Sequence, residues 1–305
     1  MQRTSEIVAG APGAQPERDP ALTRLRHGVY ANAEDLEQPS RGARHLAQIR
    51  AVAAVRRRPM FARQSALALH GIAYGQEPDL VFTTGGTTTA RRKAGVVHVP
   101  IELDPVDVTE VDGLLVTSLP YALADVARRC DPLVAVAALD EALRLQSVTK
   151  QEVTAALGRQ SRRGRAAAVW AIDFADAAAE SVGESYSRVR IFQLGFAAPE
   201  LQVRVIGRSG RRYRVDMCWR FADRRPLYGE FDGQVKYGEL ANKAGKSGAQ
   251  ALAEEKARED DIRFSGDTAH WVWDEMMSPR RFERVLLAHR VPRIRRPSLA
   301  LLRTP

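Results

Sequence analysis

Apolar and polar residues alternate along two short stretches in the second half of the chain, 212–219 (RYRVDMCW) and 227–232 (LYGEFD). Such alternation is typical of strands that are buried on one face, so we predict a strand over each stretch. The apolar face of the first strand comprises Tyr213, Val215, Met217 and Trp219. Asp216 lies on its opposite face, and Glu230 and Asp232 lie on the polar face of the second strand.

The segment between these strands, 221–226 (FADRRP), has the composition of a turn, which predicts an antiparallel hairpin. A hairpin centred near Asp223 places Asp216 directly opposite Glu230, with β-carbons roughly 5 Å apart. Like charges at that distance repel, and a divalent cation relieves the repulsion. Two alternatives stay open: both carboxylates point into solvent, or another register separates them.

A third acidic residue precedes the hairpin. The stretch 181–194 (SVGESYSRVRIFQL) is predicted to be a helix that ends at Gly195, with Glu184 in its first turn. Glu184 is therefore a candidate member of the acidic site. The alternative is a capping box, in which Glu184 only accepts a hydrogen bond from the backbone N–H of Ser181.

The order of these elements is a helix with Glu, a strand, a strand with Asp and a strand with Glu-x-Asp. Together with the stretch 228–238 (YGEFDGQVKYG), this order resembles the PD-(D/E)xK restriction-endonuclease-like superfamily over residues 181–275, especially the branch related to very-short-patch-repair endonucleases. The resemblance implies an endonuclease that uses Mg²⁺ or Mn²⁺. By that resemblance Glu184 matches the acidic residue of the first helix, Asp216 the central metal ligand and Glu230 the second ligand.

The third motif position of that superfamily usually holds Lys, and this chain has Asp232 there. Three explanations stay open. Asp232 would be an additional metal ligand beside Asp216 and Glu230. Otherwise Lys236 or Lys256 would supply the positive charge, or cleavage has been lost. A divalent ion on hard oxygen ligands activates water and stabilises developing charge, and a nearby lysine stabilises the transition state. Lys236 follows the strand end by four residues and is the nearer candidate, with a solvated loop lysine as the alternative.

Two further predicted elements complete this domain. The stretch 269–274 (AHWVWD) is predicted to be a strand. A helix follows, with Ser278 as its N-cap and Pro279 at its first position.

The first half of the chain alternates predicted helices and short strands. Helices are expected at 43–57, 64–69, 120–129 and 133–144, and strands at 80–84, 96–100 and 113–118. Residues 85–89 (GGTTT) lack the Lys-Ser/Thr of a Walker motif and are predicted to be a turn, to which residues 91–93 (RRK) give a basic tip.

This half contains RLRHGVYA, RQSALALHGI, GLLVTSLPYALADVARR and VTKQEV, and over about residues 24–157 it resembles the AbiEi-type antitoxin regulators. The resemblance implies a winged-helix, DNA-binding domain and a cognate toxin as a possible partner. Only about twenty residues precede RLRHGVYA, so we expect a truncated winged helix.

The expected fold class is α/β: a restriction-endonuclease-like three-layer α/β/α domain preceded by an α+β regulator domain. The predicted boundaries are a disordered N-terminus at 1–22, the regulator domain at 23–158, the nuclease-like domain at 160–290 and a basic tail at 291–305.

Lys and Arg outnumber Asp and Glu, which gives a formal net charge of +9 and favours polyanionic partners, DNA above all. The alternative is that the arginine content only reflects a GC-rich genome. Lysines of the Gly-rich loop 233–248 and a basic pair on the predicted helix are candidate nucleic-acid contacts: Lys243, Lys246, Lys256 and Arg258.

Cys130 and Cys218 show neither zinc-site spacing nor a disulfide framework, and no apolar run approaches the length of a membrane span. A cytoplasmic protein without membrane contact is therefore expected. Two functions stay open: a Mg²⁺-dependent DNA endonuclease in repair or phage defence, and a non-catalytic nucleic-acid-binding regulator of antitoxin type with a degenerate nuclease core.

Overall fold

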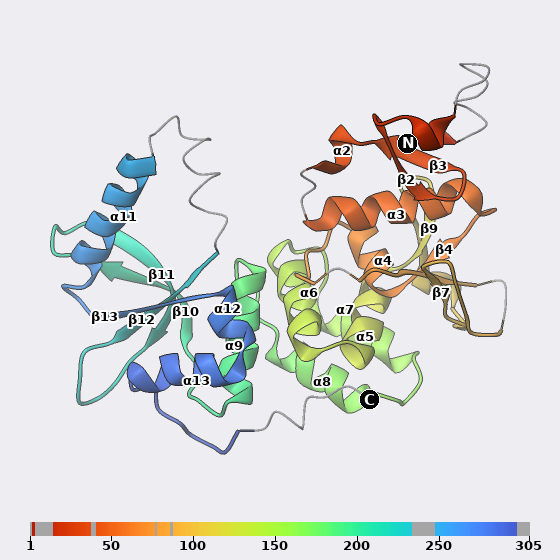
Figure 1. Cartoon of the computed structure of the whole chain (residues 1–305). Coiled ribbons are helices and arrows are strands. Elements are labelled where there is room, and N and C mark those ends of the chain that lie inside the picture. The colour runs from red at the N-terminus through yellow and green to blue at the C-terminus, as the bar shows by residue number, and fades with distance from the viewer. Residues whose placement is uncertain are drawn as a thin grey trace. The chain divides into compact units, whose positions relative to one another are not determined.

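The chain forms a mixed α/β structure with three sheets (Figure 1). The computed structural model describes residues 2–3, 15–37, 41–76, 78–85, 88–233 and 248–297. Over those ranges, every helix is too short or too polar to cross a membrane.

The chain folds into two compact units that interleave along the sequence. The first contains residues 1–130 and 145–174, and the second contains 131–144 and 175–305. The expected boundary near 158–160 thus falls inside the first unit. Residues 131–144, which precede that boundary, belong to the second unit.

A buried arginine explains why residues 145–174 belong to the first unit. Arg128 is only 3% exposed, and its guanidinium donates to Gln160 Oε1 at 2.9 Å and to Ser161 Oγ at 2.5 Å. It also donates to the backbone oxygen of Arg163. The carbonyl of Arg128 packs so closely on Gly164 that a β-carbon there would lie 2.2 Å from it. A buried charge requires these partners, and they hold the segment in place.

The first unit contains a six-stranded mixed sheet. Its strand order is β6 (Arg91–Lys93), β7 (Val96–His98), β5 (Val81–Thr84), β4 (Met60–Phe61), β9 (Leu114–Thr117) and β8 (Val108–Val111). The helices of this unit are α2 (Glu34–Glu37), α3 (Arg41–Val55), α4 (Arg63–Leu69), α5 (Leu119–Arg129), α7 (Lys150–Gly158) and α8 (Arg165–Phe174). The helices and strands predicted in this unit are confirmed, with ends that differ by a few residues.

A small sheet in the same unit has the order β1 (Gln2–Arg3), β3 (Val29–Asn32) and β2 (Leu22–Arg26). The expected disorder of 1–22 therefore does not hold for residues 2–3, nor for the 3-10 turn Pro16–Arg18. Of the expected basic tail, residues 291–297 are described and pair with the chain near Gly195 through the backbone of Ile294.

The second unit is built on a four-stranded sheet with the order β10 (Glu200–Ile206), β11 (Arg212–Trp219), β12 (Leu227–Asp232) and β13 (Asp267–Val272). The first three strands are antiparallel, and β13 runs parallel to β12. Helix α11 (Gly248–Ile262) lies between the two parallel strands in sequence. The other helices are α6 (Pro132–Arg144), α9 (Val182–Gln193), α12 (Trp273–Met277) and α13 (Pro279–Ala288).

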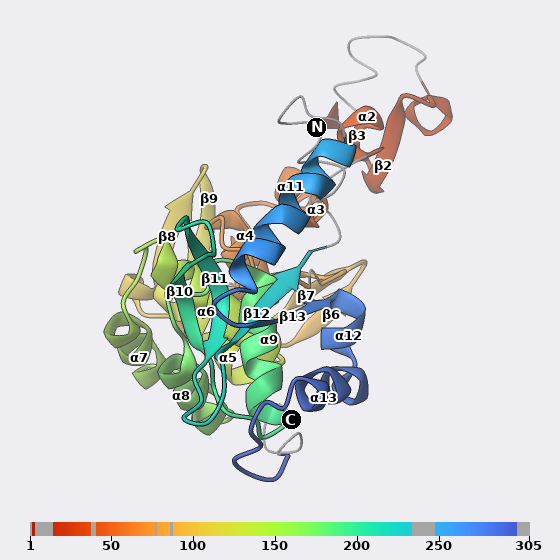
Figure 2. The same ribbon diagram turned by 90° about the vertical axis from the view of Figure 1, so that its left-hand side faces the viewer.

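Helices α9 and α11 cover opposite faces of this sheet, as Figure 1 shows and as Figure 2 shows from the α11 side. On the α9 face, Trp271 Nε1 donates to Ser187 Oγ at 2.8 Å, and a β-carbon on Gly183 would overlap the Phe231 ring. On the α11 face, Ile262 packs in a buried cluster with Val215 of β11. The helix–sheet–helix layering thus follows from small residues on one side and aliphatic contacts on the other.

Two sequence predictions about this sheet are wrong. Tyr213 and Val215 do not share a face with Trp219, because both pack on α11, and Tyr213 donates its hydroxyl to Asp261 at 2.8 Å. The alternation changes where β11 runs beside Gln202, which has a left-handed backbone with φ 53°. The strand predicted at 269–274 ends at Val272, because Trp273 begins helix α12.

A buried ion pair connects α6 to α9 within the second unit. Arg188 Nη1 contacts Asp140 Oδ2 at 2.7 Å, and the two side chains are 9% and 1% exposed. Asp140 also accepts a hydrogen bond from the backbone of Asp176 at 2.7 Å. Removal of one partner of such a pair leaves an uncompensated charge inside the protein.

Substitution Asp140→Ala should therefore lower the free energy of unfolding of this unit by about 3–5 kcal/mol, measured by denaturant titration. The neighbouring Glu141→Ala is the matched control, because Glu141 pairs with Arg144 at the surface on the same helix. Its effect should stay within about 1 kcal/mol. Equal effects of the two substitutions would contradict the role assigned to the Asp140–Arg188 pair.

Candidate functional site

The predicted hairpin and its register are confirmed. Strands β11 and β12 pair antiparallel, with Trp219 opposite Leu227, Cys218 opposite Tyr228 and Met217 opposite Gly229. Asp216 and Glu230 are the next two residues in the same register. Gly229 is required at its position, because a β-carbon there would lie 2.6 Å from the Trp271 ring and 2.9 Å from that of Trp219.

Asp216 lies where the ladder between these strands ends. Its Oδ2 accepts a hydrogen bond from the backbone N–H of Phe231 at 3.3 Å. In a longer β11–β12 pairing, a backbone carbonyl of β11 would accept a hydrogen bond from β12. Here the Asp216 carboxylate accepts one instead. This contact holds the Asp216 side chain against the backbone of β12 at Phe231.

Glu230 is held by an arginine from helix α11. Arg258 Nη2 lies 2.7 Å from Glu230 Oε1, and Arg258 Nη1 lies 3.0 Å from Glu230 Oε2. This two-pronged geometry is the strongest form of a carboxylate–arginine contact. Burial would lower the pKa of Arg258, but the hydrogen bonds and the charge of Glu230 outweigh burial and raise it.

Asp232 pairs with a histidine on the neighbouring strand. Its Oδ2 lies 3.2 Å from Nδ1 of His270, which is the residue opposite Glu230 on β13. The other ring nitrogen of His270 is 3.5 Å from Glu259 Oε1, an ion-pair distance without hydrogen-bond geometry. The hydrogen bond to Asp232 raises the pKa of His270, and the nearby acidic charges reinforce it while burial opposes it.

Glu184 acts as a helix cap. One of its oxygens accepts from Ser181 Oγ at 2.8 Å, and the other accepts from the backbone of Glu180 at 3.0 Å and from Gln202 at 2.9 Å. Glu184 is 5% exposed, so these donors compensate its burial. The capping alternative considered from the sequence is found only in part: Ser181 Oγ accepts from the backbone N–H of Glu184 at 3.2 Å, but the backbone N–H that donates to the Glu184 carboxylate is that of Glu180 and not that of Ser181.

The predicted basic residues are placed only in part. Lys236, Lys243 and Lys246 lie outside the described residues. Lys256 is exposed on helix α11. Arg258, expected to contact nucleic acid, instead turns to the sheet and pairs with Glu230 and Glu255.

The described residues do not fit a divalent metal centre as they are arranged. Among them, no group of three or more His, Cys, Asp and Glu side chains is placed so that it could hold a metal ion. Glu230 is engaged by a guanidinium, and Asp232 by an imidazole. Three hard oxygen ligands around one point would require these contacts to open.

The roles of Arg258 and His270 were not predicted. The stretch 254–260 (EEKARED) has the charge spacing of an exposed helix. This spacing does not indicate that Arg258 contacts the sheet. The alternation of the predicted strand 269–274 does place His270 on the face opposite Trp271. This alternation was a usable signal for the polar face.

Comparisons with known proteins identify relatives without a known role. Two uncharacterized proteins of Mycobacterium tuberculosis, from two strains, are each 38% identical to this chain over 110 residues. The alignment covers 36% of this chain and 41% of each relative, so less than half of either protein is compared. No family model matches the chain, and no solved structure matches it.

The pKa of His270 gives a direct test of the Asp232 contact. A histidine with a raised pKa holds its proton more tightly when folded, so its contribution to stability is full below about pH 6.5 and is lost as the pH rises through the folded-state value. Asp232→Asn should lower the pKa of His270 in an NMR titration of the imidazole. Asp274→Asn, on an exposed carboxylate, is the control and should leave it unchanged. An unaltered pKa in Asp232→Asn would contradict the contact.

Proposed function

We propose that this chain is a non-cleaving nucleic-acid-binding protein, with a nuclease-like sheet whose acidic residues are neutralised by the protein itself. The observation that carries the proposal is the ion pair between Arg258 and Glu230. Arg258 supplies, beside Glu230, a positive charge that a divalent ion would otherwise supply.

The energetics of this pair favour the proposal. Glu230 is 12% exposed and Arg258 is 30% exposed, so the pair is shielded from water over much of its surface. A metal ion would have to displace the guanidinium, and Arg258 would then lose its more buried partner and keep the exposed Glu255. Loss of one partner from a desolvated pair is costly.

The nucleic-acid part of the proposal is supported by charge. The net charge of +9 favours binding to phosphate backbones. The order of helix, strands and acidic residues in the second unit is the one that resembles PD-(D/E)xK proteins, and the first half resembles AbiEi-type regulators. Under this proposal DNA is the partner, with a cognate toxin as a further candidate suggested by the second resemblance.

A Mg²⁺-dependent endonuclease is the second candidate. The observation in its favour is the hairpin register, in which Met217 lies opposite Gly229, so that Asp216 and Glu230 are the next residues of the two strands. Under this candidate Arg258 would swing away, and the carboxylates of Asp216, Glu230 and Asp232 would rearrange around the ion. Wild-type protein would then bind a divalent ion with only a modest cost.

The substitution Arg258→Ala separates the two candidates. It frees Glu230, so under the non-cleaving proposal it should increase the affinity for Mn²⁺, measured by calorimetry, by on the order of tenfold, or 1.4 kcal/mol. Wild-type protein and Glu230→Ala should bind Mn²⁺ equally weakly.

Arg220→Ala is the control, because Arg220 pairs with Glu200 at an exposed position of the same sheet. It should leave Mn²⁺ binding at the wild-type level. Tight binding by wild-type protein that Glu230→Ala abolishes would contradict the proposal and favour the endonuclease.

Nucleic-acid binding is tested by fluorescence anisotropy with labelled double-stranded DNA, single-stranded DNA and RNA over a range of salt concentrations. We expect the affinity to fall steeply with salt. A plot of log K against the logarithm of the salt concentration has a slope of about −0.9 for each phosphate that the protein neutralises. Absence of salt-dependent binding to all three probes would contradict the proposal.

A further inference from the structure

A second basic region lies in the first unit, on the hairpin formed by β6 and β7. Its two-residue turn, Ala94–Gly95, has positive φ at both positions, 46° and 75°, as tight hairpin turns require. Arg91 pairs with His98, and Lys93 pairs with Val96. Directly paired residues share a face, so these four side chains lie on one side of the hairpin.

Arg92 lies on the opposite side, because successive residues of a strand point to opposite faces. It is as exposed as Arg91 and Lys93 and belongs to the same strand. The hairpin therefore divides one run of three cations into two sets.

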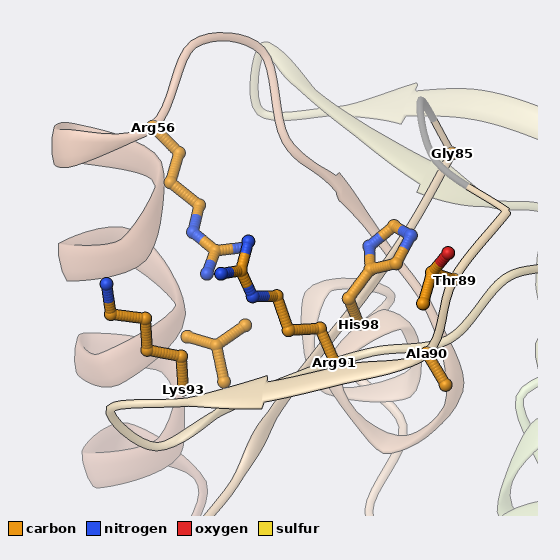
Figure 3. A pocket seen from close by; sticks show the side chains of 8 residues that line it. Arg56, Gly85, Thr89, Ala90, Arg91, Lys93 and His98 are labelled. Carbon is orange, nitrogen blue, oxygen red and sulfur yellow. The ribbon is translucent and has the colours of Figure 1, made fainter.

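The face with Arg91 and Lys93 forms the floor of a pocket of about 740 Å³. Arg56, just beyond the end of α3, closes it from above, and Figure 3 shows the Arg56 and Arg91 side chains extending toward one another across it. The described residues that line it are Arg56, Gly85, Thr89, Ala90, Arg91, Lys93, Val96 and His98. Among these lining residues, three are cationic at neutral pH and none is a carboxylate.

These charges are not compensated within the described part of the chain. No ion pair between described residues involves Arg56, Arg91 or Lys93, and the contact of Arg56 is a 3.5 Å hydrogen bond to Thr83 Oγ1. A fourth cation lies nearby: the Arg26 guanidinium donates to the carbonyl of Ala94 at 2.7 Å. Burial lowers the pKa of Arg26, and the charge of Arg56 lowers it further.

We infer that this pocket binds a phosphate group of a nucleic-acid strand, through the guanidiniums of Arg56 and Arg91 and the ammonium of Lys93. Guanidiniums present forked donors that match phosphate oxygens, and converging cations without an acidic partner favour an anion between them. A volume of about 740 Å³ has room for a nucleotide around that phosphate. This inference rests on the proposed function and assigns the contact to a particular surface.

The test compares Arg91→Ala with its matched control Arg92→Ala, since both remove one exposed arginine from the same strand. Anisotropy with a labelled DNA duplex should show about tenfold weaker binding for Arg91→Ala. The slope of log K against the logarithm of the salt concentration should also become smaller in magnitude by about one. Arg56→Ala should behave like Arg91→Ala. Arg92→Ala should stay within about twofold of wild type, and equal losses in Arg91→Ala and Arg92→Ala would overturn the inference.

A second arm uses inorganic pyrophosphate, titrated by calorimetry, as a probe without a nucleic-acid chain. Wild-type protein should bind it, and both Arg56→Ala and Arg91→Ala should weaken that binding by about tenfold. Pyrophosphate binding with this pattern but no binding to any nucleic acid would support the pocket and overturn the proposed function. Nucleic-acid binding that Arg56→Ala and Arg91→Ala leave unchanged would overturn the pocket and leave the proposed function standing.

Discussion

The contact between Arg258 and Glu230 is the interaction on which the second unit's polar face depends. It connects helix α11 to strand β12 through two hydrogen bonds, and Arg258 also reaches the carbonyl of Arg214 on β11 at 3.4 Å. Glu230 is only 12% exposed, so its charge requires a partner inside the structure. The guanidinium of Arg258 supplies that partner from a helix that must then stay over the sheet.

Arginine charges are used in two ways in this chain. In the second unit Arg258 and Arg188 each face a carboxylate, so their charges are used inside the structure. In the first unit Arg128 and Arg159 also pair with carboxylates, whereas Arg56 and Arg91 line a pocket whose described lining residues include no carboxylate. A charge that is satisfied internally contributes little to the field outside, whereas a cluster without counter-charge attracts polyanions. The proposed function follows from that difference as much as from the total charge.

Much of the fold could be predicted from the sequence, because hydrophobic periodicity decides most elements. The strands 212–219 and 227–232 and their hairpin register followed from alternation and from a turn centred near Asp223. The faces of Tyr213 and Val215 did not, because they depend on a left-handed residue on the neighbouring strand. The partners of the acidic residues were also missed: Arg258 is 28 residues from Glu230, and a charge pattern along a helix does not say which charge turns inward. For Glu184 the motif predicted local partners, and two of them, Glu180 and Ser181, lie within four residues, but the contact with Gln202 of β10 could not be predicted from local sequence.

A plasmid-nicking assay with Mg²⁺ or Mn²⁺ tests the central claim most directly, because it asks whether the acidic face performs chemistry. Wild-type protein and Glu230→Ala should leave supercoiled plasmid intact to the same extent, at protein concentrations that bind DNA fully. Metal-dependent nicking by wild-type protein that Glu230→Ala abolishes would contradict the account.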